Sequence, residues 1–428
     1  MSTEISYNDC LNKMFGLRRF GIKLGLCTIT NILNNLENPH RSFKSIHIAG
    51  TNGKGSIASA LAAILRCSGY TVGLYTSPHL VRFNERIRIN NSQIADKDVV
   101  LAYNAVKNAN YGKREPTFFE FATAMAFYEF GLKKVDWAVI ETGMGGRLDA
   151  TNIIQPEISV ITNISIEHQA YLGDTISQIT REKGGIIKEY SPVITGVQQK
   201  QSIAVLEEIA QKKQAPFYRL GDKFNVIKNQ NGTFTYYGIE NIWPDMRTGL
   251  LGNHQVDNAA LVLATCEMLF KNNVKLTIEN IKKGLLENVW PGRLEVISSS
   301  PHILLDGAHN LVASQNLAEF IYQNFDDKKV TLVLGILDDK PYSAMLENLL
   351  PICSKVILTR PIIERAISPE KIYPCAKAII SDVKIISNVT EAFRYAVETA
   401  LPDEVICVAG SLYVVGEVKE YVEKNPLN

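Results

Sequence analysis

The sequence lacks several features that mark special classes of protein. Its seven cysteines are odd in number, scattered and never in a C-x-x-C pair, which argues against a disulfide framework and a zinc site. Cys407, inside the apolar run VICVAG, is expected to be a core residue. No apolar run reaches the roughly 18 residues that span a bilayer, and the N-terminus has no basic region followed by an apolar one. We therefore expect a cytoplasmic protein without a membrane partner.

The charge balance is also close to neutral. Lys and Arg number 45 against 44 Asp and Glu, so no global basic field exists to attract nucleic acid, and any anion site must be local. Hydrophobic residues make up 46% and charged residues 21%, as in an ordinary globular chain. The 428 residues exceed the roughly 250–300 at which single cores usually divide, so two domains are expected.

Apolar runs bounded by turn residues alternate with helical patterns over the first two thirds of the chain. This alternation predicts an α/β domain with a mainly parallel, doubly wound sheet. The sequence pattern changes at 215–250. There, short strand-like stretches of alternating residue type flank an Asn-Gly pair and predict a β-hairpin. The expected strands are 44–49, 71–76, 136–141, 158–164 and 192–196, with helices at 117–132 and 174–188.

A second α/β series follows the segment VISSSPH at 296–302, whose serines and proline suggest a boundary. We expect a first domain over 1–296, a linker at 297–300 and a smaller α/β domain over 301–428. The β-type runs of this second domain are 302–305, 330–335, 355–359, 383–386 and 404–409.

The strongest single motif is GTNGKGS at 50–56, which lies between an expected strand and an expected helix. Glycines allow backbone N–H groups to turn toward phosphate oxygens, and Lys54 supplies a charge for the outer phosphates. The spacing differs from G-x-x-x-x-G-K-[ST], because two residues separate Gly50 from Gly53 and Gly55 precedes Ser56. Strand and helix context both favour a phosphate-binding loop over a simple surface turn.

Two further segments place polar residues after strands. Glu141 ends the run DWAVIE and precedes a glycine cluster, so it could offer Mg²⁺ a carboxylate oxygen, although a surface glutamate is the alternative. In LLDGAHN, Asp306 could bind a metal or orient an amine and His309 could move a proton, whereas an Asx turn is the structural alternative. His168 and Lys183, each considered alone, are more often structural or solvated.

Ten motifs follow one another along nearly the whole chain. They are GTNGKGS at 50–56, TSPHL at 76–80, TFFE at 117–120, ETGMGGRLDATN at 141–152, EHQAYLG at 167–173, EKGGIIK at 182–188, GNHQVDNA at 252–259, WPGRLE at 290–295, DGAHN at 306–310 and GSLYVVGEV at 410–418. Taken together and in this order, they resemble the folylpolyglutamate synthase/dihydrofolate synthase family of the Mur ligase superfamily. Gly184 and Leu311 depart from the usual Ala and Pro of that family.

This resemblance implies a Mur ligase-like P-loop ATPase domain followed by a Rossmann-like domain, with ATP and two Mg²⁺ ions as cofactors. Asn258 matches an adenine contact, and Arg293 and Asp306 match phosphate contacts. Lys54, Asp306 and His309 are the expected catalytic residues. The expected phosphate-binding residues are Thr51, Asn52, Gly53, Lys54, Gly55 and Ser56.

The resemblance also assigns metal and substrate contacts. Ser77 and Glu141 match ligands of one Mg²⁺, while Glu141, His168 and a carbamylated Lys183 match ligands of the second. The residues that match pterin contacts of bifunctional bacterial members are Thr117, Phe118, Phe119, Glu120, Leu148, Asp149 and Ala150.

The implied reaction is ligation of L-glutamate to dihydropteroate and to reduced folates through an acyl phosphate. We expect these small molecules to be its partners and the chain to act as a monomer. Two alternatives stay open at this point: a Mur-type ligase of peptidoglycan precursors, and a nucleotide-switch protein that makes no product. Glutamate-dependent release of ADP and phosphate would exclude the switch.

Overall fold

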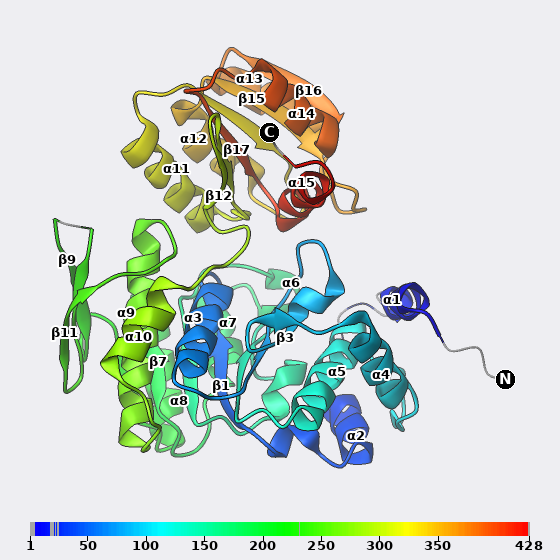
Figure 1. Ribbon diagram of the computed structural model, residues 1–428, viewed down its shortest axis with the longest axis vertical. Helices are drawn as coiled ribbons and strands as arrows, with labels where there is room; N and C mark the ends of the chain where they lie inside the picture. The colour runs from blue at the N-terminus through cyan, green and yellow to red at the C-terminus, as the bar shows by residue number, and fades with distance from the viewer. Residues whose placement is uncertain (1–4, 18–20, 22, 24, 231, 427–428) are drawn as a thin grey trace. The chain divides into compact units, whose positions relative to one another are not determined.

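The computed structural model describes residues 5–17, 21, 23, 25–230 and 232–426, and these divide into two compact units (Figure 1). The described residues up to Gly249, together with Gln255–Val289, form the first unit. The second unit contains Leu250–His254 and the chain from Trp290 onward. Each unit is built around its own β-sheet, so the α/β fold class is confirmed.

The first unit is centred on an eight-stranded sheet in the order β4-β3-β2-β5-β1-β6-β7-β8. From β2 to β8 in this order, each strand is parallel to its neighbour. At the other edge of the sheet, β3 pairs antiparallel with β2 and β4 pairs antiparallel with β3. Every residue of β5 is buried, as expected for a parallel strand covered on both faces. The strands are β1 (Lys44–Ala49), β2 (Val72–Tyr75), β3 (Ile87–Ile89), β4 (Ser92–Gln93), β5 (Trp137–Glu141), β6 (Ile158–Ile161), β7 (Val193–Thr195) and β8 (Phe217–Arg219).

Helices pack onto this sheet. Helix α3 contacts β1, β2 and β5, while Phe127 of α5 lies in a core cluster with Ala138 and Ile140 of β5. The α-helices of the first unit are α1 (Tyr7–Gly16), α2 (Cys27–Asn35), α3 (Lys54–Cys67), α4 (Asp96–Lys107), α5 (Phe118–Leu132), α6 (Gln169–Leu172), α7 (Ile176–Gly184), α8 (Lys200–Lys212), α9 (Asn253–Lys271, which begins in the second unit) and α10 (Ile278–Leu286). Short 3₁₀ turns are η2 (Pro39–Arg41), η3 (Phe83–Arg86) and η4 (Ala150–Ile153).

The segment 215–250 forms a small sheet, in agreement with the predicted hairpin. β9 (Asn225–Lys228) and β10 (Phe234–Tyr237) pair antiparallel, and β11 (Ile242–Met246) adds a third strand. Its beginning differs from the prediction, because β8 belongs to the main sheet.

A buried carboxylate on α9 anchors this small sheet. Glu267 is 2% exposed and accepts hydrogen bonds from the Tyr236 hydroxyl at 2.6 Å and from the backbone N–H groups of Ile239 at 2.7 Å and Asn241 at 2.9 Å. The turn between β10 and β11 therefore closes on a side chain from a helix that follows it in the sequence.

Glu267→Ala is expected to lower the free energy of unfolding by about 3 kcal/mol, because buried donors lose a charged acceptor. Urea titration followed by circular dichroism would measure the change. Glu207→Ala, at an exposed position of α8, is the matched control and should change stability little. A loss under about 1 kcal/mol for Glu267→Ala would show that the turn does not depend on this carboxylate.

The second unit has a six-stranded sheet in the order β12-β13-β17-β14-β15-β16, parallel except for β12. Its strands are β12 (Glu295–Ser299), β13 (His302–Leu305), β14 (Val330–Leu334), β15 (Lys355–Arg360), β16 (Val383–Asn388) and β17 (Val405–Ala409). Its helices are α11 (Leu311–Phe325), α12 (Tyr342–Leu349), η5 (Leu350–Ile352), α13 (Pro369–Ile379), α14 (Val389–Thr399) and α15 (Leu412–Lys424).

The predicted boundary differs from the division seen here. The segment predicted as a linker, 297–300, lies in the β12–β13 hairpin, and the division falls earlier, between Val289 and Trp290. The serines and the proline of this segment suggested a boundary, but β12 is an edge strand that is paired on one side only, where polar residues are tolerated. Cys407 is fully buried in the second core, as predicted. Across the described part of the chain, no helix is long and apolar enough to cross a membrane.

Candidate active site

The glycine loop joins β1 to α3, as the sequence predicts. Gly50 and Gly53 have φ values of +148° and +84°, which side-chain-bearing residues rarely adopt. A Cβ on Gly50 would lie 1.9 Å from Thr162 Oγ1, and one on Gly53 would lie 2.6 Å from Asn258 Oδ1. The loop is therefore held closely between the end of β6 and the first turns of α9, and it leads directly into the positive end of the α3 dipole.

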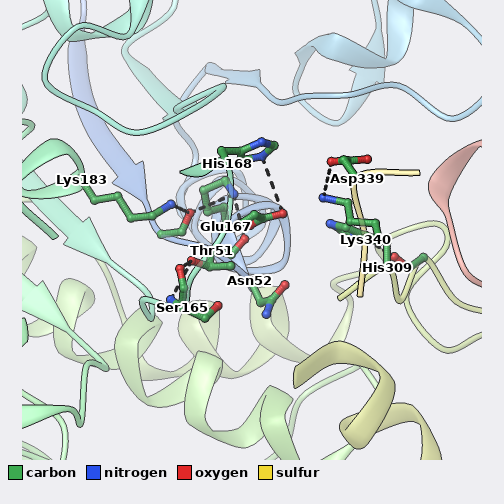
Figure 2. Close-up of polar contacts among 12 residues, drawn as sticks. Thr51, Asn52, Ser165, Glu167, His168, Lys183, His309, Asp339 and Lys340 are labelled. Atoms are coloured by element: carbon green, nitrogen blue, oxygen red, sulfur yellow. Dashed lines mark hydrogen bonds and ion pairs between the residues drawn. The ribbon is translucent and has the colours of Figure 1, made fainter. Parts of the chain in front are cut away.

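Residues that sequence reasoning missed hold this loop in place. The backbone carbonyl of Asn163 accepts a hydrogen bond from the Thr51 N–H at 2.9 Å, and the Asn163 side-chain Oδ1 accepts one from the Asn52 N–H at 3.0 Å. Thr162 Oγ1 donates to the Asn52 carbonyl at 2.6 Å. Ser165 N–H donates to Thr51 Oγ1 at 3.0 Å (Figure 2). The signal was available, since Thr162 and Asn163 are polar residues directly after an apolar strand. Because the Thr51 and Asn52 N–H groups already donate within the chain, their contact with phosphate stays a prediction.

Three predicted residues converge at the carboxyl ends of neighbouring strands β2, β5 and β1. Lys54 Nζ donates to the carbonyl oxygens of Gly50 at 3.1 Å and Thr51 at 3.0 Å, and lies 3.9 Å from Glu141 Oε1. Glu141 is 5% exposed, and its other oxygen accepts from the Ser77 N–H at 3.2 Å. A cation, a carboxylate and a backbone donor therefore meet beside the loop.

Lys183 approaches the same loop from α7. It is 3% exposed and its Nζ donates to the Gly50 carbonyl at 2.7 Å. Burial and, to a smaller extent, the nearby Lys54 cation lower the pKa of the Lys183 amine to about 7, while Glu167 and Asp149 act in the opposite direction. Gly184, which follows it, leaves room for α8, because a Cβ there would lie 2.7 Å from Ile209 Cδ1.

His168 differs from these buried groups. It is exposed, has a φ of +53° at the start of α6, and its Nε2 lies 3.6 Å from Glu167 Oε1 (Figure 2). Among the residues that the structure describes, no group of three or more His, Cys, Asp and Glu side chains could hold a metal. The Glu141 carboxylate is the kind of hard oxygen donor that Mg²⁺ prefers, and the assignment of metal ligands at this site stays a prediction.

The TFFE segment starts α5 with a capping box. Thr117 Oγ1 accepts from the Glu120 N–H at 3.2 Å, Glu120 accepts from the Thr117 N–H at 2.8 Å, and Arg114 donates to both Glu120 oxygens. The rings between them are half-buried. Phe119 covers Gly143, since a Cβ on that glycine would lie 2.4 Å from the ring. Thr117 and Glu120 therefore have a structural role whatever they bind.

The Phe118 ring contacts another aromatic ring and a guanidinium group. Its ring stacks on Phe15 with centroids 5.6 Å apart, and the Arg86 guanidinium lies 5.2 Å from its centroid. Arg86 is buried and donates to His79 Nδ1 at 2.7 Å. The rings at the start of α5 are thus at the margin of the core.

In the LDA segment, Leu148 and Ala150 flank a buried carboxylate. Asp149 is 5% exposed and accepts from the Met144 N–H at 2.8 Å, the Thr151 N–H at 3.0 Å and the Thr151 hydroxyl at 2.5 Å. Burial raises the pKa of Asp149, and these hydrogen bonds lower it. Its direct contact with a pterin stays a prediction, and its observed partners belong to the chain itself.

The second unit brings together the residues around DGAHN. Asp306 accepts from the Leu294 N–H and the Ala308 N–H, both at 2.8 Å, the latter forming an Asx turn. Burial raises the pKa of Asp306, and the Arg293 guanidinium lowers it. His309 Nδ1 lies 2.8 Å from the Gly307 carbonyl, so this nitrogen carries the proton. The side chain that caps α11 is Asn310 and not Asp306.

The loop, the strand-end carboxylate and the second α/β unit define a class of protein. The family described as "Mur ligase middle domain" matches residues 48–266, more than half of the chain, and "Mur ligase, glutamate ligase domain" matches 292–412. The chain is thus a Mur-type ligase. Within that class it belongs to the folylpolyglutamate synthase/dihydrofolate synthase family, as the resemblance implied.

Individual relatives agree with this assignment. Dihydrofolate synthase/folylpolyglutamate synthase of Bacillus subtilis is 35% identical over 97% of this chain and 99% of its own length. The solved structure of E. coli FolC in complex with DHPP and ADP has 27% identity and a TM-score of 0.92, covering 99% of both chains. A Yersinia pestis bifunctional enzyme complexed with AMPPNP and Mn ion has 29% identity and a TM-score of 0.88, covering 98% of both chains.

Proposed function

We propose that this protein is an ATP- and magnesium-dependent ligase that joins L-glutamate to dihydropteroate and to reduced folates. The observation that carries the proposal is the meeting of Lys54 and Glu141, 3.9 Å apart, beside a glycine loop in a chain of this family. The names and ligands of its relatives support the folate substrates over a peptidoglycan precursor or a nucleotide switch.

The chemistry follows from these groups. A substrate carboxylate oxygen attacks the γ-phosphorus of ATP, so that an acyl phosphate forms and ADP leaves. The glutamate amine then attacks the acyl carbon, loses a proton and displaces phosphate. Lys54 and the N-terminus of α3 stabilise negative charge on the transferred phosphoryl group, and positioning supplies much of the rate.

Magnesium fits the donor set, and when bound it would neutralise charge on the phosphate oxygens. Ser77 and Glu141 would hold one ion. His168 and Lys183 would complete a second site with Glu141, provided that Lys183 is carbamylated. In that modification the uncharged amine adds CO₂ and releases a proton, giving a carbamate with two oxygens. Burial of Lys183 and its lowered pKa support this, because only the uncharged amine reacts.

The remaining assignments complete the proposal. Phe118 and Phe119 would offer flat apolar faces to a pterin ring, and Leu148 and Ala150 would add apolar contacts. Asn258 would contact adenine, and Arg293, Asp306 and His309 would serve the nucleotide phosphates and proton transfer. We further propose that the protein works as a cytoplasmic monomer with small molecules as its partners.

Purified protein with ATP, Mg²⁺ and L-glutamate should convert both dihydropteroate and a reduced folate, with products resolved by mass. Each product should gain one glutamate, and ADP and phosphate should be released only when glutamate is present. A UDP-muramyl substrate is the matched control and should give no product. Turnover of folate without turnover of dihydropteroate would remove the first activity and leave folate polyglutamylation alone.

A further inference from the structure

A buried hydrogen-bond chain runs from β1 to the glycine segment that follows β5. His47 and Thr151 are both fully buried, and His47 Nε2 lies 2.8 Å from Thr151 Oγ1. The Thr151 hydroxyl lies 2.5 Å from Asp149 Oδ1, and the other Asp149 oxygen accepts from the Met144 N–H. The chain thus connects the strand that carries the ATP loop to Gly143–Gly146.

Hydrogen-bond chemistry fixes the direction of this chain. An ionised carboxylate only accepts, so the Thr151 hydroxyl must donate to Asp149. The hydroxyl oxygen then accepts from His47, so Nε2 carries the proton, and Nδ1 has no partner in the structure. Burial keeps the imidazole neutral, because it lowers the pKa of His47 to about 3. The donor pattern is therefore unchanged over the whole physiological pH range.

The segment that this chain holds contacts the proposed substrate region. Gly143 lies under the Phe119 ring, and a Cβ on Gly146 would lie 2.7 Å from the Lys183 carbonyl oxygen. Arg147 N–H donates to the Glu182 carbonyl at 2.7 Å. In contrast, Thr162 and Asn163 hold the ATP loop. Different side chains therefore hold the Gly143–Gly146 segment and the ATP loop.

We propose that His47 and Thr151 are positioning residues that hold Asp149 and, through it, the Gly143–Gly146 segment against Phe119 for recognition of the pterin substrate. This inference rests on the proposed function. It goes further in naming two residues that touch no substrate and in assigning to Asp149 a role in shaping the segment.

Thr151→Val, which keeps the side-chain shape and removes the hydroxyl, tests the inference. The KM for dihydropteroate should rise about tenfold, as expected when a buried carboxylate loses a donor, while the KM for ATP changes less than about twofold. Thr151→Ser should restore the wild-type KM. The matched control is Thr265→Val, because Thr265 is buried and its hydroxyl binds only the Leu261 carbonyl of its own helix.

The outcomes distinguish a failure of the proposed function from a failure of the positioning role of His47 and Thr151. A wild-type protein that ligates glutamate to neither substrate refutes the proposed function, whatever the variants do. An active wild type with an unchanged dihydropteroate KM in Thr151→Val overturns the inference, as does an equal rise of both KM values. Should Thr151→Val not fold, His47→Leu removes the donor to the hydroxyl and should raise the dihydropteroate KM about threefold, and an unchanged value would overturn the inference equally.

Discussion

Lys54→Met is expected to reduce kcat for ligation by much more than tenfold while the fold stays intact. The lysine Nζ lies 3.9 Å from Glu141 Oε1 at the start of α3, and methionine fills a similar volume without charge. The hydrogen bonds to the Gly50 and Thr51 carbonyls are lost with it, but Thr162 and Asn163 still hold the loop. Charge on the transferred phosphoryl group then loses the cationic side chain of the loop.

Steady-state kinetics with dihydropteroate, together with circular dichroism of the purified variant, would measure the effect. Lys97→Met, at an exposed position of α4, is the matched control and should retain wild-type activity. A Lys54→Met enzyme that keeps more than about a tenth of the wild-type kcat has lost less than about 1.4 kcal/mol of barrier lowering. That result would contradict the assignment of Lys54 to phosphate stabilisation.

Lys183→Arg should be nearly inactive, although arginine keeps the positive charge. A guanidinium cannot add CO₂ at neutral pH, and it is also too large for a site that is 3% exposed and 2.7 Å from the Gly50 carbonyl. Lys183→Met, which fits the volume, should be inactive as well. If the amine itself were the functional group, removal of CO₂ from the buffer would have no effect on the wild type.

Three measurements test whether Lys183 carries a carbamate. Intact-protein mass under gentle conditions should show the added CO₂, activity should fall in CO₂-depleted buffer, and bicarbonate should restore it. The uncharged fraction of the Lys183 amine increases as pH rises through about 7, so uptake of CO₂ by the metal-free protein should also increase over that range. Full activity of Lys183→Met would refute the metal-site role.

Local patterns in the sequence were enough to predict much of the fold and part of the site. The alternation of apolar runs with helical periods predicted ten of the fourteen strands of the two main sheets, because buried parallel strands are continuous apolar runs, but it did not place β3, β4, β8 or β12 in them. Glu141 was predicted at the site from its place at the end of such a run. The edge strand β12 was missed for the opposite reason, since an edge strand pairs on one side and tolerates serines.

The sequence by itself determined the strand–loop–helix unit around Lys54, since glycine conformation and helix initiation depend on neighbours along the chain. The partners of that unit were decided by the tertiary structure. Asn52 meets Asn163 across 111 positions, and His47 meets Thr151 across 104, distances over which no local periodicity carries information. The first contact forms because the adjacent parallel strands β1 and β6 align their carboxyl ends. The second forms because the buried His47 side chain within β1 finds a polar partner in the turn η4.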